Sequence, residues 1–101
     1  MKAGRTIILT RHPGAVEFLA NRGFCGPIVA HLDIGMLCSG DRVIGTLPIN
    51  IAATLQSHGI EYWHLCVHQT AADRGRELSE VRLEELGTRI RRYTITEIFW
   101  S

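Results

Sequence analysis

The feature that most constrains the fold is the stretch over residues 43–55, where a short apolar run changes into a segment of good helix formers. The apolar start is followed by the break Gly45-Thr46, after which Pro48 opens the second segment. Proline suits the first turn of a helix, where its missing N–H is no loss. The pattern therefore predicts a buried strand over residues 42–44 and a helix over residues 49–57.

The turn between this strand and this helix has the chemistry of an anion site. Free N–H groups and the helix dipole make the first turn of a helix attractive to negative charge. Gly45 would let a phosphate approach the backbone, and Thr46 and Asn50 offer hydrogen bonds. A strand–helix turn that binds nothing explains these residues equally well, so the rest of the chain decides between the two.

The remaining chain alternates between short apolar, β-branched runs and amphipathic segments. Because strands alternate with helices, we expect one domain over residues 1–101 with an α/β fold: an open, mostly parallel sheet of about five strands flanked by helices, joined by right-handed crossovers. Besides the two elements above, strands are expected at residues 6–10, 28–32, 60–67 and, at an edge, 88–100, and helices at residues 15–22 and 79–86.

Composition limits the class of protein and its partners. The chain is 46% hydrophobic and 21% charged, as in an ordinary globular domain, and its net charge is +1. No global field therefore draws it to a long nucleic acid or a membrane, and no segment is long and apolar enough to span one. Three cysteines without C-x-x-C spacing argue against a disulfide framework or a zinc knuckle and fit a cytoplasmic location.

Polar side chains collect where the predicted strands end. In open α/β sheets, ligands bind beyond the carboxyl ends of the strands, so these side chains predict a site for a compact anion. They are Thr10, Arg11 and His12 after the first strand, Asp33 after the second, Gly45, Thr46 and Asn50 after the third, and His68, Asp73, Arg74 and Arg76 after the fourth.

The pair Arg11-His12 is the best candidate for catalysis. It places a fixed cation beside a group that titrates near neutrality, so it could orient a phosphodiester, stabilise its charge and move a proton. The alternative is a solvated turn in which Arg11 pairs with a carboxylate. Arg74 and Arg76 could close over the site as a phosphate clamp, or could belong to a charged loop.

Metal binding is the weaker interpretation of the remaining chemistry. Asp33 and Asp73 could bind Mg²⁺, but two separate carboxylates more often cap turns or helices. The alternating His64, Cys66 and His68 share one face of a strand that we expect to be covered, which favours buried, hydrogen-bonded histidines over metal ligands. Cys25 and Cys38 have no evident base partner, which predicts packing roles for them, and Trp63, Phe99 and Trp100 are expected to make core or subunit contacts.

Four motifs in order resemble a small family of CRISPR-associated accessory proteins of type III systems. They are Arg11-His12-Pro13-Gly14-Ala15, His31-Leu32-Asp33, Gly45-Thr46-Leu47-Pro48-Ile49-Asn50 with Ala52-Ala53, and Arg74-Gly75-Arg76-Glu77-Leu78. The resemblance covers most of the chain, and the loop over residues 67–72 fits it least well.

The resemblance implies a ring nuclease, an enzyme that opens cyclic tetra-adenylate and so switches off antiviral effectors. It further implies a Rossmann-like homodimer that holds the ring at its two-fold axis, without a cofactor or metal. A ribose 2′-oxygen would attack the adjacent phosphate and leave linear di-adenylate with a 2′,3′-cyclic phosphate. Placed on the matched motifs, Arg11 and His12 would be catalytic, and Thr10, Gly45, Thr46, Leu47, Asn50, Arg74 and Arg76 would bind the substrate.

Two other functions fit the same residues. A binding module that holds the ring without cutting it would need the same phosphate contacts. A general endoribonuclease would need a basic track for a longer strand, and the net charge of +1 speaks against one.

Overall fold

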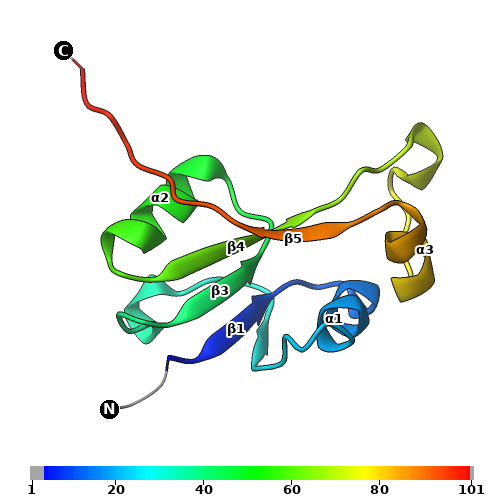
Figure 1. Cartoon of the computed structure of the whole chain (residues 1–101), viewed down its shortest axis with the longest axis horizontal. Helices are drawn as coiled ribbons and strands as arrows, with labels where there is room; N and C mark the ends of the chain where they lie inside the picture. The colour runs from blue at the N-terminus through cyan, green and yellow to red at the C-terminus, as the bar shows by residue number, and fades with distance from the viewer. Residues whose placement is uncertain (1–3, 101) are drawn as a thin grey trace.

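The parallel core of the sheet comes from three short apolar strands that each run into a helix or a turn. The computed structural model describes residues 4–100. Its strands are β1 (Thr6–Leu9), β2 (Ile28–Val29), β3 (Arg42–Gly45), β4 (Glu61–Cys66) and β5 (Arg89–Arg92), in the spatial order β2-β1-β3-β4-β5. The first four are mutually parallel and β5 is antiparallel to β4, so the predicted α/β, Rossmann-like fold is confirmed (Figure 1).

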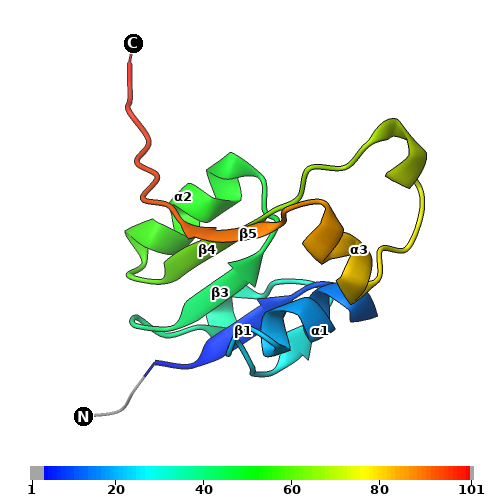
Figure 2. The same cartoon turned by 45° about the vertical axis from the view of Figure 1, so that its right-hand side comes forward.

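The two faces of the sheet bury two separate apolar clusters, because successive strand residues point to opposite faces. Ile8, Ile44 and Leu65 pack on one face against the helices α1 (Pro13–Ala20) and α3 (Glu80–Glu85). Ile7, Val43 and Tyr62 pack on the other face against α2 (Ile49–Ser57). Figures 1 and 2 show α1 and α3 next to each other and α2 apart from them. The fold thus has three layers, with the sheet in the middle.

Helix α2 ends at the predicted residue, α3 ends one residue before its predicted end and α1 ends two residues before its own. Gly59 and Gly87 follow α2 and α3 with positive φ angles of 77° and 70°, which glycine adopts without strain. Ser79 caps α3 by accepting a hydrogen bond from the N–H of Arg82 (3.1 Å). Helix α1 begins two residues before the expected position, because Pro13 occupies its first turn.

The predicted last strand over residues 88–100 is too long. The pairing of β5 with β4 ends at Arg92. Beyond it, the side chain of Gln56 in α2 forms hydrogen bonds with the backbone of the next residues. Its amide donates to the carbonyl oxygen of Tyr93 (2.5 Å), and its side-chain oxygen accepts from the N–H of Ile95 (2.8 Å). The chain therefore crosses α2 and then leaves the body of the fold (Figure 1).

Other differences concern the second strand and several side chains. β2 is also shorter than predicted, because Asp33 begins a 3₁₀ turn, η1 (Ile34–Met36), soon after it. Cys25 and Cys38 are exposed rather than packed. Phe99 and Trp100 are 85% and 96% exposed, so the prediction that they are core residues is wrong, while the alternative of a subunit contact stays a prediction. In the part of the chain that the structure describes, no helix has the length and apolarity needed to cross a membrane.

Candidate functional site

A cavity of about 670 Å³ lies at the carboxyl ends of the parallel strands. The chain passes from β1 to β2 on one side and later to β3 on the other, so the order of strands reverses between β1 and β3. Ligands of open α/β sheets bind at such a reversal. Leu9 and Thr10 at the end of β1 and Gly45 and Thr46 at the end of β3 line the cavity, which therefore occupies the place that this topology favours.

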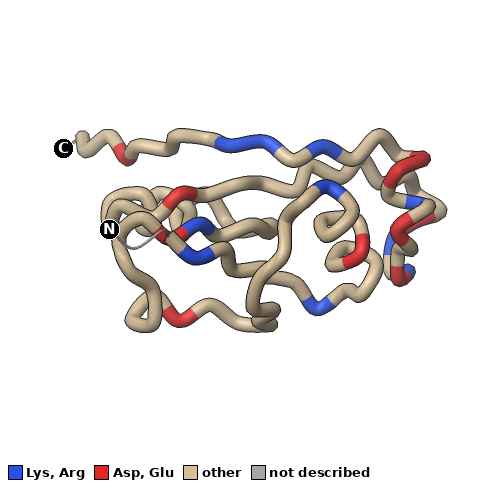
Figure 3. Tube along the Cα trace, turned by 60° about the horizontal axis from the view of Figure 1, so that its bottom comes forward, with Lys and Arg blue, Asp and Glu red and all other residues tan. Residues whose placement is uncertain are grey.

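The cavity is locally basic although the molecule is nearly neutral. Its lining includes two arginines and three histidines and, among the residues that the structure describes, no aspartate or glutamate. Basic and acidic residues are otherwise dispersed along the trace (Figure 3). The ionisable and polar lining residues are Thr10, Arg11, His12, His31, Thr46, His64, Gln69 and Arg76.

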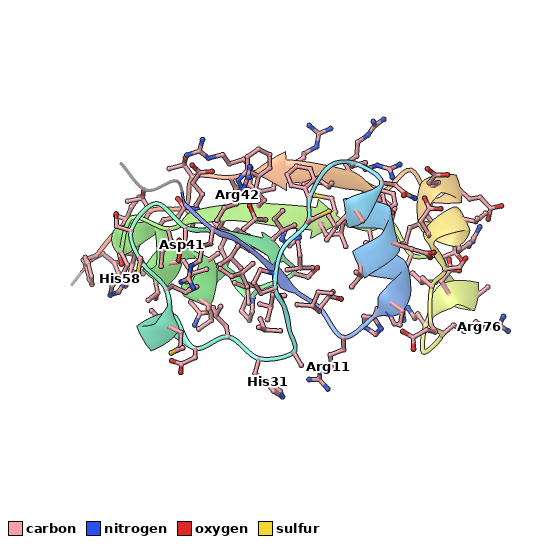
Figure 4. The ribbon with its side chains drawn as sticks, turned by 90° about the horizontal axis from the view of Figure 1, so that it is seen from below. Arg11, His31, Asp41, Arg42, His58 and Arg76 are labelled. Atoms are coloured by element: carbon pink, nitrogen blue, oxygen red, sulfur yellow. The ribbon has the colours of Figure 1, made fainter. Side chains whose placement is uncertain are left out.

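Arg11 and Arg76 carry the fixed positive charge of this cavity. Within residues 4–100, neither guanidinium has a carboxylate within ion-pair distance. Arg11 is exposed and projects from the same edge of the fold as His31, while Arg76 comes from a separate segment (Figure 4). Two guanidinium groups without protein partners suit a ligand that brings its own negative charge.

His12 is held at the entrance to α1. It is the residue that precedes the helix, and its carbonyl oxygen accepts from the N–H groups of Ala15 and Val16. Its own N–H donates to the hydroxyl of Thr10 (3.1 Å), and its ring Nδ1 lies 2.6 Å from Oε1 of Glu77. The backbone of the turn and an opposing carboxylate therefore both orient this imidazole.

The first turn of α1 also fixes the segment that carries Glu77. A side chain at Gly14 would collide with the backbone of Leu78, so glycine permits the two segments to meet. On the far side of that segment, Asp73 accepts from Nε and Nη2 of Arg82 at 2.9 and 3.0 Å and from the N–H of Thr70. The Arg82 guanidinium holds the pKa of the Asp73 carboxyl well below its usual range. The cavity wall formed by this segment is thus anchored at both ends.

At the end of β3, the glycine is required by packing. A Cβ atom at Gly45 would lie 2.6 Å from the carbonyl oxygen of Leu9, so a larger residue would push β1 away. Packing therefore requires glycine here, and the predicted approach of a phosphate at Gly45 stays a prediction. The next residues are also tied to β4, because Thr46 donates to the carbonyl oxygen of Leu65 (3.5 Å) and the N–H of Leu47 donates to the hydroxyl of Tyr62 (2.8 Å).

Most of the residues assigned to catalysis or substrate binding come together at this cavity, and two do not. Asn50 is exposed in the first turn of α2, and Arg74 is exposed just after the turn η2 (Ala71–Asp73); neither lines the cavity. Of the other residues predicted at the strand ends, Asp33, His68 and Asp73 do not line it either. The cavity also lies against the first turn of α1 rather than that of α2, where the anion site was predicted. The predicted residues that line it are Thr10, Arg11, His12, Gly45, Thr46, Leu47 and Arg76.

The carboxylates considered as magnesium ligands have structural roles. Asp33 caps η1 by accepting from the N–H of Gly35 (3.0 Å), and Asp73 forms a capping box with Thr70 at η2. Their expected capping roles are confirmed. Across residues 4–100, no three His, Cys, Asp or Glu side chains are grouped so that they could hold a metal ion.

Four ionisable or polar residues at or beside the cavity were not assigned to it from the sequence, namely His31, His64, Gln69 and Glu77. His31 lies two residues after the end of β2 and lines the cavity, whereas the strand was predicted to continue to residue 32 and so to include it. His64 was correctly expected to be hydrogen-bonded, and it also faces the cavity. Glu77 stood within a recognised motif, but only the folded chain brings it to His12.

Comparisons with known proteins identify one family. Residues 7–96 match the family model described as "Putative CRISPR-associated protein (Cas_VVA1548)". No curated protein and no solved structure gives a significant match. Because the family model covers most of the chain, including every segment that lines the cavity, this protein belongs to that family of CRISPR-associated proteins.

Proposed function

We propose that this protein is a ring nuclease that binds and cleaves cyclic tetra-adenylate and thereby switches off type III CRISPR signalling. The observation that carries the proposal is the cavity at the β1–β3 reversal, which is lined by arginines and histidines and, in the described residues, by no carboxylate. A cyclic oligonucleotide is a compact polyanion, and a local basic cavity on a nearly neutral protein selects it over long RNA. Membership of a CRISPR-associated family supplies the biological setting.

In the proposed reaction, the substrate supplies its own nucleophile, so no metal is needed to activate water. A ribose 2′-oxygen attacks the adjacent phosphorus, the bond from phosphorus to the 5′-oxygen breaks, and two such events release di-adenylates with 2′,3′-cyclic phosphates. Arg11 would stabilise the charge that develops on the phosphoryl oxygens. His12, oriented by Glu77, would assist proton transfer. Arg76 and the turn over residues 45–47 would hold the substrate.

We propose that the active form of the enzyme is a homodimer. Cavities of about 300–1,000 Å³ enclose drug-sized ligands, and the cavity here, about 670 Å³, falls in that range. A ring of four nucleotides is larger than such a ligand, so one protomer would enclose part of it. A two-fold axis would present the same groups to both halves of a two-fold symmetric ring.

A comparison of substrates separates this proposal from its rivals. Purified protein is incubated with labelled cyclic tetra-adenylate or with linear RNA of mixed sequence, and the products are resolved by chromatography. Selective opening of the ring supports the ring nuclease. Full recovery of bound, intact ring would make the protein a binding module, and equal cleavage of both substrates would make it a general endoribonuclease.

A further inference from the structure

Strand β4 brings a histidine and a buried tyrosine to the wall of the cavity. Tyr62 and His64 point to the same face of the strand, because they are two residues apart. The Tyr62 side chain is buried, with 1% of the residue exposed, whereas His64 is half-buried and lines the cavity. The Tyr62 oxygen lies 2.6 Å from Nδ1 of His64.

Three neighbours surround the Tyr62 oxygen, and they determine its hydrogen bonds. The N–H of Leu47 donates to it at 2.8 Å, and the carbonyl oxygen of Gly45, which can only accept, lies 3.1 Å away. A phenol has one hydrogen to donate and can accept two hydrogen bonds. Burial also raises the pKa of Tyr62 above its usual value, so the hydroxyl keeps its hydrogen at neutral pH.

In one placement of the hydrogens, all three contacts of the Tyr62 oxygen are hydrogen bonds. The hydroxyl donates to Gly45 and accepts from Leu47, and its remaining lone pair accepts from an N–H at Nδ1 of His64. A neutral histidine protonated at Nδ1 has its lone pair at Nε2. Among the described residues, Nε2 of His64 has no hydrogen-bond partner, and the residue lines the cavity, so this nitrogen is the one left for a bound molecule.

We propose that His64 is a catalytic proton acceptor of this site and that Tyr62 is the residue that positions it. This inference rests on the proposed ring nuclease activity. Nε2 removes the proton of the ribose 2′-hydroxyl as the 2′-oxygen bonds to phosphorus. The bond from phosphorus to the 5′-oxygen breaks, and the 5′-oxygen takes a proton from water, a transfer that His12 would assist. The imidazolium then returns its proton to solvent.

His64 is better fixed for this task than His12. The His12–Glu77 pair joins two side chains that are 63% and 65% exposed. His64 is held by a buried hydroxyl that is itself tied to the backbone at the end of β3. The aromatic ring of Tyr93 lies against it edge-on, with centroids 6.1 Å apart. The other ionisable side chains placed close to His64 are Cys66, on the same face of β4, and Arg91, opposite His64 on β5.

The test combines matched substitutions with a direct reading of the tautomer. In His64→Asn the side-chain amide can replace Nδ1 and keep the contact with Tyr62, whereas in His64→Gln it reaches the position of Nε2. Neither amide accepts a proton. Both variants should therefore bind the ring within about threefold of wild type and cleave it about 100-fold more slowly under single-turnover conditions. His58→Asn, at the far end of the molecule, is the control and should cleave normally (Figure 4).

Nitrogen-15 NMR of the histidine side chains gives a readout that does not depend on activity. The His64 signals should show a proton on Nδ1 in wild type, and Tyr62→Phe should lose this preference and cleave the ring more slowly. A wild-type proton on Nε2, or a His64→Gln enzyme as fast as wild type, would overturn the inference. A wild type that holds Nδ1–H but leaves the ring intact would refute the proposed function instead, and with it the catalytic role.

Discussion

The imidazole Nδ1 of His12 lies 2.6 Å from Oε1 of Glu77, which joins the start of α1 to the segment between η2 and α3. The two residues are 65 positions apart in the chain. The contact lies beside the cavity, since His12 lines it and Arg76, immediately before Glu77, lines it as well. The orientation of His12 and the position of Arg76 therefore depend on the same segment.

Glu77→Gln tests whether this contact serves catalysis rather than stability. Because both side chains are about two-thirds exposed, water screens the pair, and the variant should unfold within a few degrees of wild type. The single-turnover rate should fall by about tenfold, since His12 loses its orienting carboxylate. Glu97→Gln, which removes an exposed carboxylate outside the cavity, is the control. Equal rates for wild type and Glu77→Gln from pH 5 to 8 would rule out this role.

Arg11→Ala removes the fixed cation proposed to stabilise the transition state. Loss of one such donor typically slows a reaction by about 10² to 10³, and we expect an effect in this range on the single-turnover cleavage of cyclic tetra-adenylate. The melting temperature should hardly change, because Arg11 is exposed. Arg89→Ala, an exposed arginine of β5 that does not line the cavity, should cleave normally. If Arg11→Ala keeps near-normal activity, the catalytic centre lies elsewhere.

Arg76 and Arg74 form a natural matched pair for binding. Both are exposed arginines of one loop, but Arg76 lines the cavity and Arg74 does not. A charge-assisted contact to phosphate lost in Arg76→Ala should weaken binding of the ring by about tenfold or more. Arg74→Ala should have a clearly smaller effect. Isothermal titration with a slowly cleaving variant measures both affinities, and a larger loss for Arg74→Ala would show that this loop rearranges around the ligand.

The stability of the fold should decrease in acid through a buried carboxylate far from the cavity. Asp41 accepts from the guanidinium of Arg5 (2.8 Å) and from two backbone N–H groups, and the ion pair with Arg5 lowers its pKa from the usual 3.8 to about 2. A carboxyl whose pKa is lower in the folded state stabilises the fold fully above its unfolded pKa, and this stabilisation is lost as pH falls toward the folded pKa.

The melting temperature should therefore be nearly constant above about pH 5 and fall between about pH 4 and pH 2. Asp41→Asn should lower it by roughly 10 °C at pH 7 and weaken its dependence on acid, because the charged hydrogen bonds are lost. Asp33→Asn, which changes an exposed cap, should keep the acid transition. Calorimetry across this pH range provides the measurement, and an unchanged acid limb in Asp41→Asn would refute the assignment.

The sequence predicts the layers of the fold because local patterns specify them. The apolar strands, the proline-led start of α2 and the glycines that end α2 and α3 each depend on a few neighbouring residues, and the structure confirms them. The end of β5 depends instead on Gln56 of α2, whose side chain forms hydrogen bonds with the backbone of Tyr93 and Ile95. A pattern of β-branched residues contains no information about such a distant partner.

The residues of the site likewise fall into those that local sequence predicts and those that only the folded chain reveals. The residues at the ends of β1 and β3 were predictable because parallel strands bring their carboxyl ends together. Asn50 and Arg74 were expected there as well, but a helix turns one side chain away and a 3₁₀ turn displaces the other. The roles of Glu77 and His64 arise from contacts with His12 and Tyr62 that only three-dimensional geometry reveals.

The most direct test of the central proposal is an incubation of labelled cyclic tetra-adenylate with the purified protein in the presence of EDTA. The products are then compared with linear standards by chromatography. We predict conversion of the ring to di-adenylate that carries a 2′,3′-cyclic phosphate, at a rate that the chelator does not change. Recovery of intact ring after long incubation, or cleavage that requires added Mg²⁺ or Mn²⁺, would contradict the proposed metal-independent ring nuclease.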